Sequence, residues 1–213
     1  RRYPPPIPAE AGSTFSCRPV RATRAFWALM AAMVCAGGCE AGMSFWGSNF
    51  AEEEFGATSR GGAGTVALFG GFMALGRVGS GVLVTRVSPL RLMLASAAAC
   101  GVATAGLGVA QSLTAAWFLF SLGGLFVACF WPTLLAVGAG QVGVRSSADF
   151  GLLAAAGITG CMLFPWGIGV IADSAGMRAG VLLLPVSMLL EALLLAALGI
   201  WSARRAAGPP PAA

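Results

Sequence analysis

The chain has 213 residues, of which 57% are hydrophobic and only 10% are charged, and its net charge of +5 comes entirely from arginine. Soluble globular proteins carry about 25% charged residues, so this composition excludes an ordinary soluble domain and predicts an all-α integral membrane protein. The sequence has no histidine, which excludes Ser-His and Cys-His nucleophilic pairs and removes the commonest metal ligand. We therefore expect a protein that is not an enzyme, with no metal site and no cofactor.

Three regions follow one another along the chain. Residues 1–24 are polar, basic and rich in proline, and we expect them to form a flexible cytoplasmic loop. Residues 25–202 contain six apolar segments, which we interpret as one six-helix transmembrane bundle. Residues 203–213 end in GPPPAA and are expected to be a disordered cytoplasmic tail.

The clearest membrane signal is the stretch Leu92–Val144, which carries no charged side chain. Each crossing of a bilayer needs about 20 apolar residues, so this stretch holds two crossings, with Gln111 and Ser112 at the turn between them. The six expected spans are residues 25–50, 63–84, 90–110, 113–139, 148–172 and 179–201.

The arginines predict the orientation of these spans. With both termini in the cytoplasm, all of the 13 arginines except Arg60 and Arg178 fall on the cytoplasmic side, and the acidic run 52–54 falls outside. Cytoplasmic loops of membrane proteins collect basic residues in this way. We therefore expect a multi-pass protein of the plasma or inner cell membrane. The orientation places three arginines at the second, cytoplasmic connection: Arg77, Arg86 and Arg91.

Glu40 lies near the middle of the first span, among glycines and alanines. A charged group at the bilayer centre costs roughly 2.5–3.5 kcal/mol, and such groups usually face a cavity or a partner. A carboxyl there can load and release a proton or accept hydrogen bonds from a polar solute; the alternative is a neutral carboxyl bonded to a neighbouring helix. Ala36, Ser44 and Gly47 share its helical face. Trp46 lies about 120° away, where it either packs sideways or caps a cavity.

The later spans contain features with structural or functional interpretations. Pro132 and Pro165 each remove a backbone hydrogen bond from a span, and bent or broken helices at membrane depth often mark transport paths. Glycines such as Gly157 and Gly160 favour close helix packing. For Glu191, within the apolar run SMLLEALLLAAL, we favour a protonated or snorkelling side chain, or a contact within an oligomer.

The segment Gly76–Arg91, GRVGSGVLVTRVSPLR, resembles the cytoplasmic G-x-x-x-D-R-x-G-R-[KR] signature of the major facilitator superfamily. That signature joins the second and third helices of each six-helix half and holds a charge-relay contact between helices. Here Thr85 stands in place of the aspartate, and Ser88-Pro89 stands in place of Gly-Arg. A threonine cannot form the ion pair. A related segment, GVIADSAGMR at 169–178, keeps its acid as Asp173.

The first span resembles the seventh helix of fucose permease-like sugar transporters within this superfamily. Its sequence GGCEAGMSFWGSNF fits their G-x-E-x-x-x-x-x-W-x-x-N-Y pattern. Glu40, Trp46 and Asn49 match the pattern, while Phe50 replaces the final tyrosine.

Two later segments extend the resemblance. FWPTLLAVGAG in the fourth span resembles the tenth helix of the same group, with Trp131 and Pro132 in register, and the fifth span resembles the eleventh helix. The matches cover roughly residues 26–200. The chain thus resembles the C-terminal half of such a transporter, helices seven to twelve, with residues 1–24 as the central cytoplasmic loop.

The resemblance implies alternating-access transport of a small polar solute, such as a sugar or related metabolite, coupled to protons. The implied partners are the lipid bilayer, the solute, and either an N-terminal six-helix half or a second copy of the chain, with no nucleic acid. Candidate substrate-binding residues are Glu40, Trp46, Asn49, Trp131 and Trp166. Candidate coupling and gating residues are Glu40, Arg77, Arg86, Arg91, Pro132 and Pro165.

Two alternatives to an active transporter remain. The chain starts at Arg1 without a methionine, which is compatible with an inactive fragment of a longer transporter. The altered signature at Thr85 is compatible with a scaffold or sensor that keeps a transporter fold without translocation. An intramembrane aspartyl enzyme is disfavoured, because Asp149 and Asp173 fall at helix ends.

Overall fold

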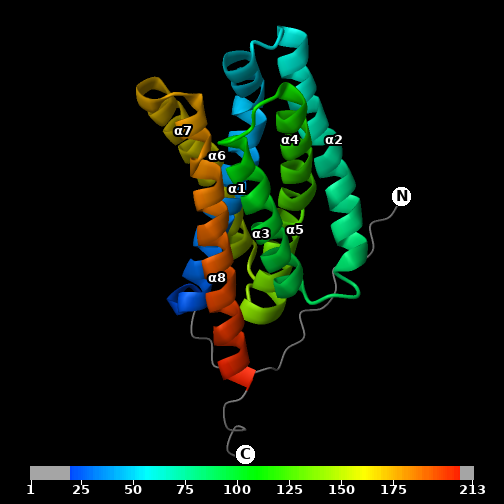
Figure 1. Ribbon diagram of the computed structural model, residues 1–213. Coiled ribbons are helices and arrows are strands. Elements are labelled where there is room, and N and C mark those ends of the chain that lie inside the picture. Colours follow the sequence, from blue (N-terminus) through cyan, green and yellow to red (C-terminus); the bar gives the residue numbers. More distant parts are fainter. Residues whose placement is uncertain (1–19, 207–213) are drawn as a thin grey trace, which may run out of the picture.

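The protein is a bundle of long helices (Figure 1). The computed structural model describes residues 20–206, apart from the side chains of Ala22 and residues 204–206. All regular structure in this part of the chain is helical, and six helical segments are long and apolar enough to span a membrane, which confirms the predicted fold class. The elements are η1 (Val20–Ala22), α1 (Arg24–Phe55), α2 (Ser59–Leu83), α3 (Pro89–Leu107), α4 (Leu113–Val127), α5 (Phe130–Val137), η2 (Gly138–Val142), α6 (Ser147–Ala175), α7 (Met177–Val181) and α8 (Leu183–Ala206).

Local sequence signals set the ends of these helices. Four helices begin after a Ser or Thr whose hydroxyl accepts a backbone N–H of the first turn, as expected for N-cap residues; these are Thr23, Thr58, Ser112 and Ser146. Pro89 occupies the first turn of α3, where its missing N–H is tolerated. Gly56 ends α1 with a left-handed φ of 61°, a conformation that glycine adopts without strain.

Two helix ends differ from the sequence prediction. The apolar pattern predicts that the first span ends at Phe50, with the acidic run 52–54 in a loop, but α1 continues through this run to Phe55. Glutamates are good helix formers, so the helix extends until Gly56 stops it. At the other end of the chain, α8 reaches Ala206, beyond the expected boundary at residue 202. Residues 1–19 and 207–213, which hold most of the expected loop and tail, lie outside the described part.

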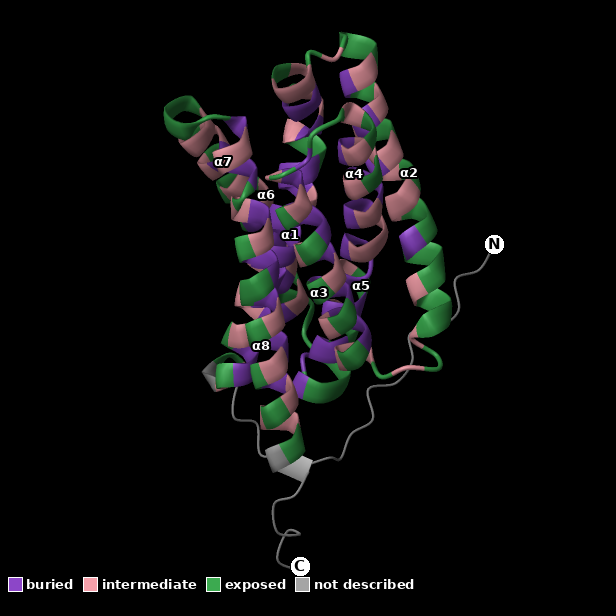
Figure 2. Ribbon diagram, viewed as in Figure 1, coloured by how far each residue is buried: buried purple, intermediate pink, exposed green. Residues whose placement is uncertain are grey.

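Helix α1 is the centre of the bundle. It packs against α2, α6 and α8, and also touches α4 and α5. In its membrane-spanning stretch 61% of the residues are buried, against 11% in α2, and Figure 2 shows the buried positions concentrated along the middle of the bundle. α3 packs against α4 and α8 on the other side of the core.

Small residues hold α1 and α6 close together. A Cβ atom on Gly37 would meet the carbonyl oxygen of Gly157, and a Cβ on Gly160 would meet the carbonyl oxygen of Val34. Backbones this close exclude any larger side chain, which confirms the packing expected of Gly157 and Gly160. By contrast, nothing lies within 4 Å of a Cβ on Gly79, so this glycine near the end of α2 does not serve helix contact.

The fourth span is divided into three pieces. α4 ends at Val127, α5 begins at Phe130, and η2 finishes the span as a single π turn from Gly138 to Val142. Pro132 explains the first interruption, because it has no N–H for the carbonyl four residues earlier and its ring collides with that carbonyl. Pro165 acts differently, since α6 continues through it without interruption.

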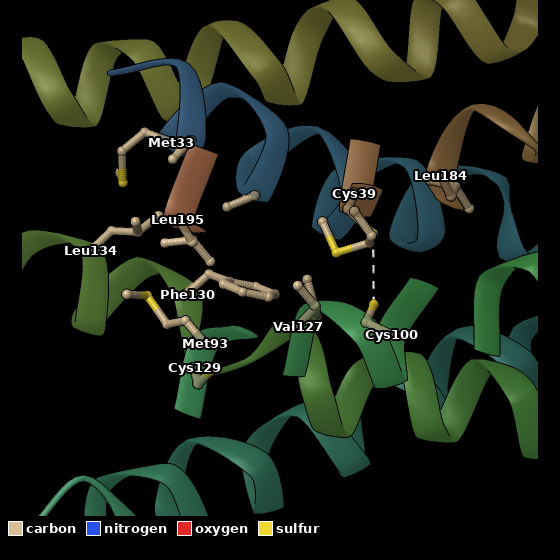
Figure 3. Close-up of a cluster of buried hydrophobic side chains, with 14 of the residues drawn as sticks. Met33, Cys39, Met93, Cys100, Val127, Cys129, Phe130, Leu134, Leu184 and Leu195 are labelled. Carbon is tan, nitrogen blue, oxygen red and sulfur yellow. Dashed lines mark hydrogen bonds between the residues drawn. The ribbon is translucent and has the colours of Figure 1, made fainter. Parts of the chain in front are cut away.

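The core contains sulfur-bearing side chains as well as aliphatic and aromatic ones. Figure 3 shows Met33, Cys39, Met93, Cys100 and Phe130 meeting between α1, α3 and the fourth span. The sulfur atoms of Cys39 and Cys100 lie 3.9 Å apart as free thiols. Free cysteine and methionine behave as polarizable apolar groups that fill irregular gaps, so this cluster needs no metal or disulfide to explain it.

Gly160→Leu is expected to separate α1 from α6 and destabilise the bundle. Overpacking typically costs about 1–3 kcal/mol, and here the obstacle is backbone, which cannot move aside as a side chain can. The free energy of unfolding in detergent would measure the effect. The matched control is Gly151→Leu on the same helix, where a Cβ meets nothing within 4 Å. Equal stability of the two variants would contradict the close α1–α6 contact.

Candidate functional site

An ion pair between α1 and α2 lies within the membrane-spanning helices. Nη2 of Arg77 donates to Oε1 of Glu40 across 3.3 Å, and it also lies 3.9 Å from the sulfur of Met73. The Glu40 side chain is 21% exposed and that of Arg77 is 53% exposed. The second carboxylate oxygen of Glu40 is buried and has no described hydrogen-bond partner. The pair therefore occupies an open side of the bundle with bonding capacity left over.

The antiparallel arrangement of α1 and α2 brings these two residues to the same depth. Glu40 and Arg77 lie at similar distances along the chain from the short connection at 56–58. Helix α2 buries only a narrow stripe, Gly62, Thr65, Phe69 and Gly76. The carbonyl oxygen of Leu125 occupies the space that a Cβ on Gly76 would need, so α2 approaches α4 closely there and Arg77 is left on the open side.

This position corrects one sequence interpretation. The count of basic residues assigns Arg77 to the cytoplasmic connection, but the residue lies inside α2, which continues to Leu83, in agreement with the expected span 63–84. It therefore does not count as a loop arginine for orientation. A charge in the apolar part of a bilayer is expensive unless it is paired or reaches an aqueous region, and Glu40 supplies the partner. The sequence feature that could have predicted this ion pair is the presence of opposite charges in two adjacent antiparallel spans.

Trp46 packs sideways against α6. Its Nε1 donates to the carbonyl oxygen of Pro165 across 2.8 Å. A Cβ atom added to Gly169 would contact the Trp46 ring. The tryptophan thus ties α1 to the part of α6 that contains the proline. No described hydrogen bond joins it to Glu40.

The other aromatic and polar candidates differ in their surroundings. Trp131 packs its ring over Gly157 of α6, and its indole nitrogen is buried without a described partner. Trp166 is 69% exposed on the outside of α6. Asn49 is exposed on α1, nine residues after Glu40, which is two and a half helical turns and thus the opposite face. None of the described hydrogen bonds or ion pairs joins these three residues to Glu40, whose described partner is Arg77.

The arginines of the α2–α3 connection form no described ion pair. Arg86 and Arg91 are exposed, and neither is among the three described salt bridges. The hydroxyl of Thr85 donates to the carbonyl oxygen of Val82 across 2.7 Å, a local turn contact. This agrees with the expectation that a threonine here cannot provide the charge-relay acid.

Two other ion pairs lie at the two ends of the bundle, and the sequence analysis predicted neither of them. At one end Nε of Arg21, just before α1, donates to Oδ1 of Asp149 across 2.5 Å; Asp149 sits three residues after the cap Ser146 at the start of α6. At the other end Nε of Arg178 donates to Oε2 of Glu54 across 2.6 Å. Arg178 also donates to the carbonyl oxygen of Gly108, which joins α1, α3 and α7.

Glu191 occupies the interior of the bundle. Its side chain is fully buried, and both carboxyl oxygens lack a described hydrogen-bond partner. Complete burial is incompatible with the snorkelling and oligomer-contact interpretations. Among the described residues, no group of three or more His, Cys, Asp or Glu side chains is arranged to hold a metal ion.

Glu191→Leu is expected to raise the free energy of unfolding by about 1–3 kcal/mol, because it removes a buried polar group that makes no described hydrogen bond. Thermal unfolding in detergent would measure the change. Glu53→Leu is the control, since Glu53 is an exposed acid near the end of α1. Destabilisation by Glu191→Leu together with unchanged stability of Glu191→Gln would instead reveal a hydrogen-bond partner.

Comparison with known proteins adds one match. Residues 1–137 fit the family described as Major Facilitator Superfamily. The matched range includes α1 to α5, and therefore both residues of the Glu40–Arg77 pair. No individual curated protein matches the chain.

Proposed function

The chain belongs to the major facilitator superfamily, and we propose that it forms the C-terminal six-helix half of a secondary transporter for a small polar solute. The observation that carries this proposal is the Glu40–Arg77 pair, which is partly exposed among membrane-spanning helices. In lipid such a pair is maintained where it faces a polar route or binds a polar ligand. Its second carboxylate oxygen is buried and has no described hydrogen-bond partner, so it is an acceptor that a solute can use once the two side chains separate.

The chemistry of the pair suits a hydroxyl-rich solute such as a sugar. A carboxylate accepts hydrogen bonds from hydroxyl groups, and a guanidinium donates from five N–H groups in a fixed fork. Only one nitrogen of Arg77 is engaged with Glu40, at the relatively long distance of 3.3 Å. A solute inserted between the two side chains would gain bonds from both, while the direct pair reforms when the solute leaves.

We propose that the same contact couples transport to protons. Adding a proton to Glu40 removes its charge and weakens its attraction for Arg77, which frees the guanidinium for solute. In alternating access two six-helix halves rock about a site near the bilayer midplane. The other half would be an N-terminal six-helix unit or a second copy, and the resemblance of the first span favours the fucose permease-like group.

Glu40→Gln and Arg77→Gln are each expected to reduce solute accumulation at least about tenfold. Losing a hydrogen bond to a charged group costs about 1.5–3 kcal/mol, and about 1.4 kcal/mol is a factor of ten. The assay is uptake of labelled monosaccharides into proteoliposomes, with and without an inward proton gradient, for the chain alone and together with a facilitator N-terminal half. Glu53→Gln is the control.

The double variant Glu40→Gln/Arg77→Gln separates transport from structure. Each single variant leaves one charge unpaired within the bundle, while the double variant removes both charges. If the pair only stabilises the fold, the double variant recovers uptake. If the pair binds solute, the double variant stays inactive although its stability recovers. Absence of uptake with every sugar and partner would favour the scaffold or inactive-fragment alternative.

The proposed orientation has both termini in the cytoplasm. In a protein whose native cysteines are replaced by alanine, Arg86→Cys is expected to react with an impermeant maleimide only after the membrane is opened. Gln111→Cys, at the opposite end of α3, is expected to react in intact cells. Both positions are exposed, so accessibility depends on the side of the membrane. The reverse labelling pattern would overturn the orientation.

A further inference from the structure

An apolar groove runs between α1, α6 and α8, away from the Glu40–Arg77 pair. Its volume is about 560 Å³, within the range of about 300–1,000 Å³ that small-molecule sites occupy. All of its lining residues are apolar, among them Ala31, Val34, Phe164, Leu193 and Leu194. Apart from the weakly polar thiol of Cys35, which also lines the groove, this lining offers no side-chain hydrogen bonds to a polar solute and suits a hydrocarbon chain.

The packing of the helices explains why the groove exists. The Phe164 ring occupies the space where a Cβ on Gly38 would stand, so α6 lies close to α1. Helix α8 packs mainly on α1 and α3 and makes little contact with α6. The side of α8 next to the groove is open, and Leu190 and Leu193 are 45% and 58% exposed.

One end of the groove carries a cation and an exposed indole. Arg24, Trp27, Ala31 and Val34 recur at helical spacing and therefore share one face of α1. Seven residues of helix place Arg24 about 10 Å beyond Ala31. Trp27 is 61% exposed, and its Nε1 donates to the carbonyl oxygen of Arg21 across 2.9 Å. Figure 1 shows the start of α1 and the last turns of α8 at this same end of the bundle.

The charge at this end is not neutralised by the described part of the protein. Arg24 is exposed and takes part in none of the described salt bridges. Among the described residues, Asp149 is the one acid at this end, and it already pairs with Arg21. An anion arriving beside Arg24 therefore meets a positive surface, while a tryptophan at this level suits the boundary between headgroups and chains.

We propose that this groove binds an anionic phospholipid, with one acyl chain along Ala31 and Val34 and the phosphate at Arg24. With the proposed orientation, the lipid belongs to the cytoplasmic leaflet, where anionic lipids concentrate. The site is separate from the transport site, so loss of lipid binding would leave the role of Glu40 and Arg77 unaffected. Failure of sugar uptake would likewise leave this lipid site intact.

The test measures lipid binding to the purified chain in detergent by native mass spectrometry and thermal unfolding. Phosphatidylglycerol is compared with phosphatidylcholine carrying the same acyl chains. We expect one tightly retained phosphatidylglycerol and a larger increase in melting temperature with that lipid. Arg24→Gln should weaken its binding about fivefold, the change that corresponds to the roughly 1 kcal/mol of one basic residue near anionic lipid.

A second variant and a charge-matched control complete the design. Ala31→Trp fills the groove and should abolish retention of the lipid, whereas Arg60→Gln removes an exposed arginine at the opposite end and should leave binding unchanged. Equal retention of both lipids, or equal effects of Arg24→Gln and Arg60→Gln, would overturn the proposal. So would cross-linking that places a second copy of the chain in the groove.

Discussion

The structure depends on how closely the other helices approach α1. Glycines of α1 and α6 leave so little space that the backbone of each helix touches the other, and α8 and α2 pack on the remaining sides. In lipid there is little hydrophobic force between helices, so packing of this kind carries much of the stability. Between α1 and α2 the Glu40 side chain remains partly exposed, and Arg77 lies beside it.

Charge placement follows from this arrangement. The ion pairs at the two ends, Arg21–Asp149 and Arg178–Glu54, join segments distant in sequence where water is near. The third pair, Glu40–Arg77, lies within the spans and keeps one oxygen unused. A pair that served stability alone would gain from full hydrogen bonding or from replacement by apolar residues. The burial of that unpartnered oxygen distinguishes this pair from the other two.

The sequence predicts the number of spans and most of their limits, because an apolar stretch as long as Leu92–Val144 fits inside lipid and not inside a soluble core. It also predicts the break before Pro132, since proline chemistry is local. It does not predict the pairing of Arg77 with Glu40, although the expected span 63–84 includes Arg77, because a count of loop arginines ignores depth and the long arginine side chain can reach either environment. The burial of Glu191 depends on which helix faces pack together. In weakly amphipathic membrane helices the sequence pattern does not show which face points into the bundle.

The divided fourth span has a mechanical consequence. Pro132 leaves the carbonyl of Ala128 without its usual amide partner, and the π turn of η2 follows only a few residues later. Because the helix is interrupted on both sides of α5, that segment can change its tilt while α4 and η2 keep their own backbone hydrogen bonds. The segment carries Trp131 over Gly157, so a pivot there would slide an indole across the surface of α6 and change which backbone groups it covers.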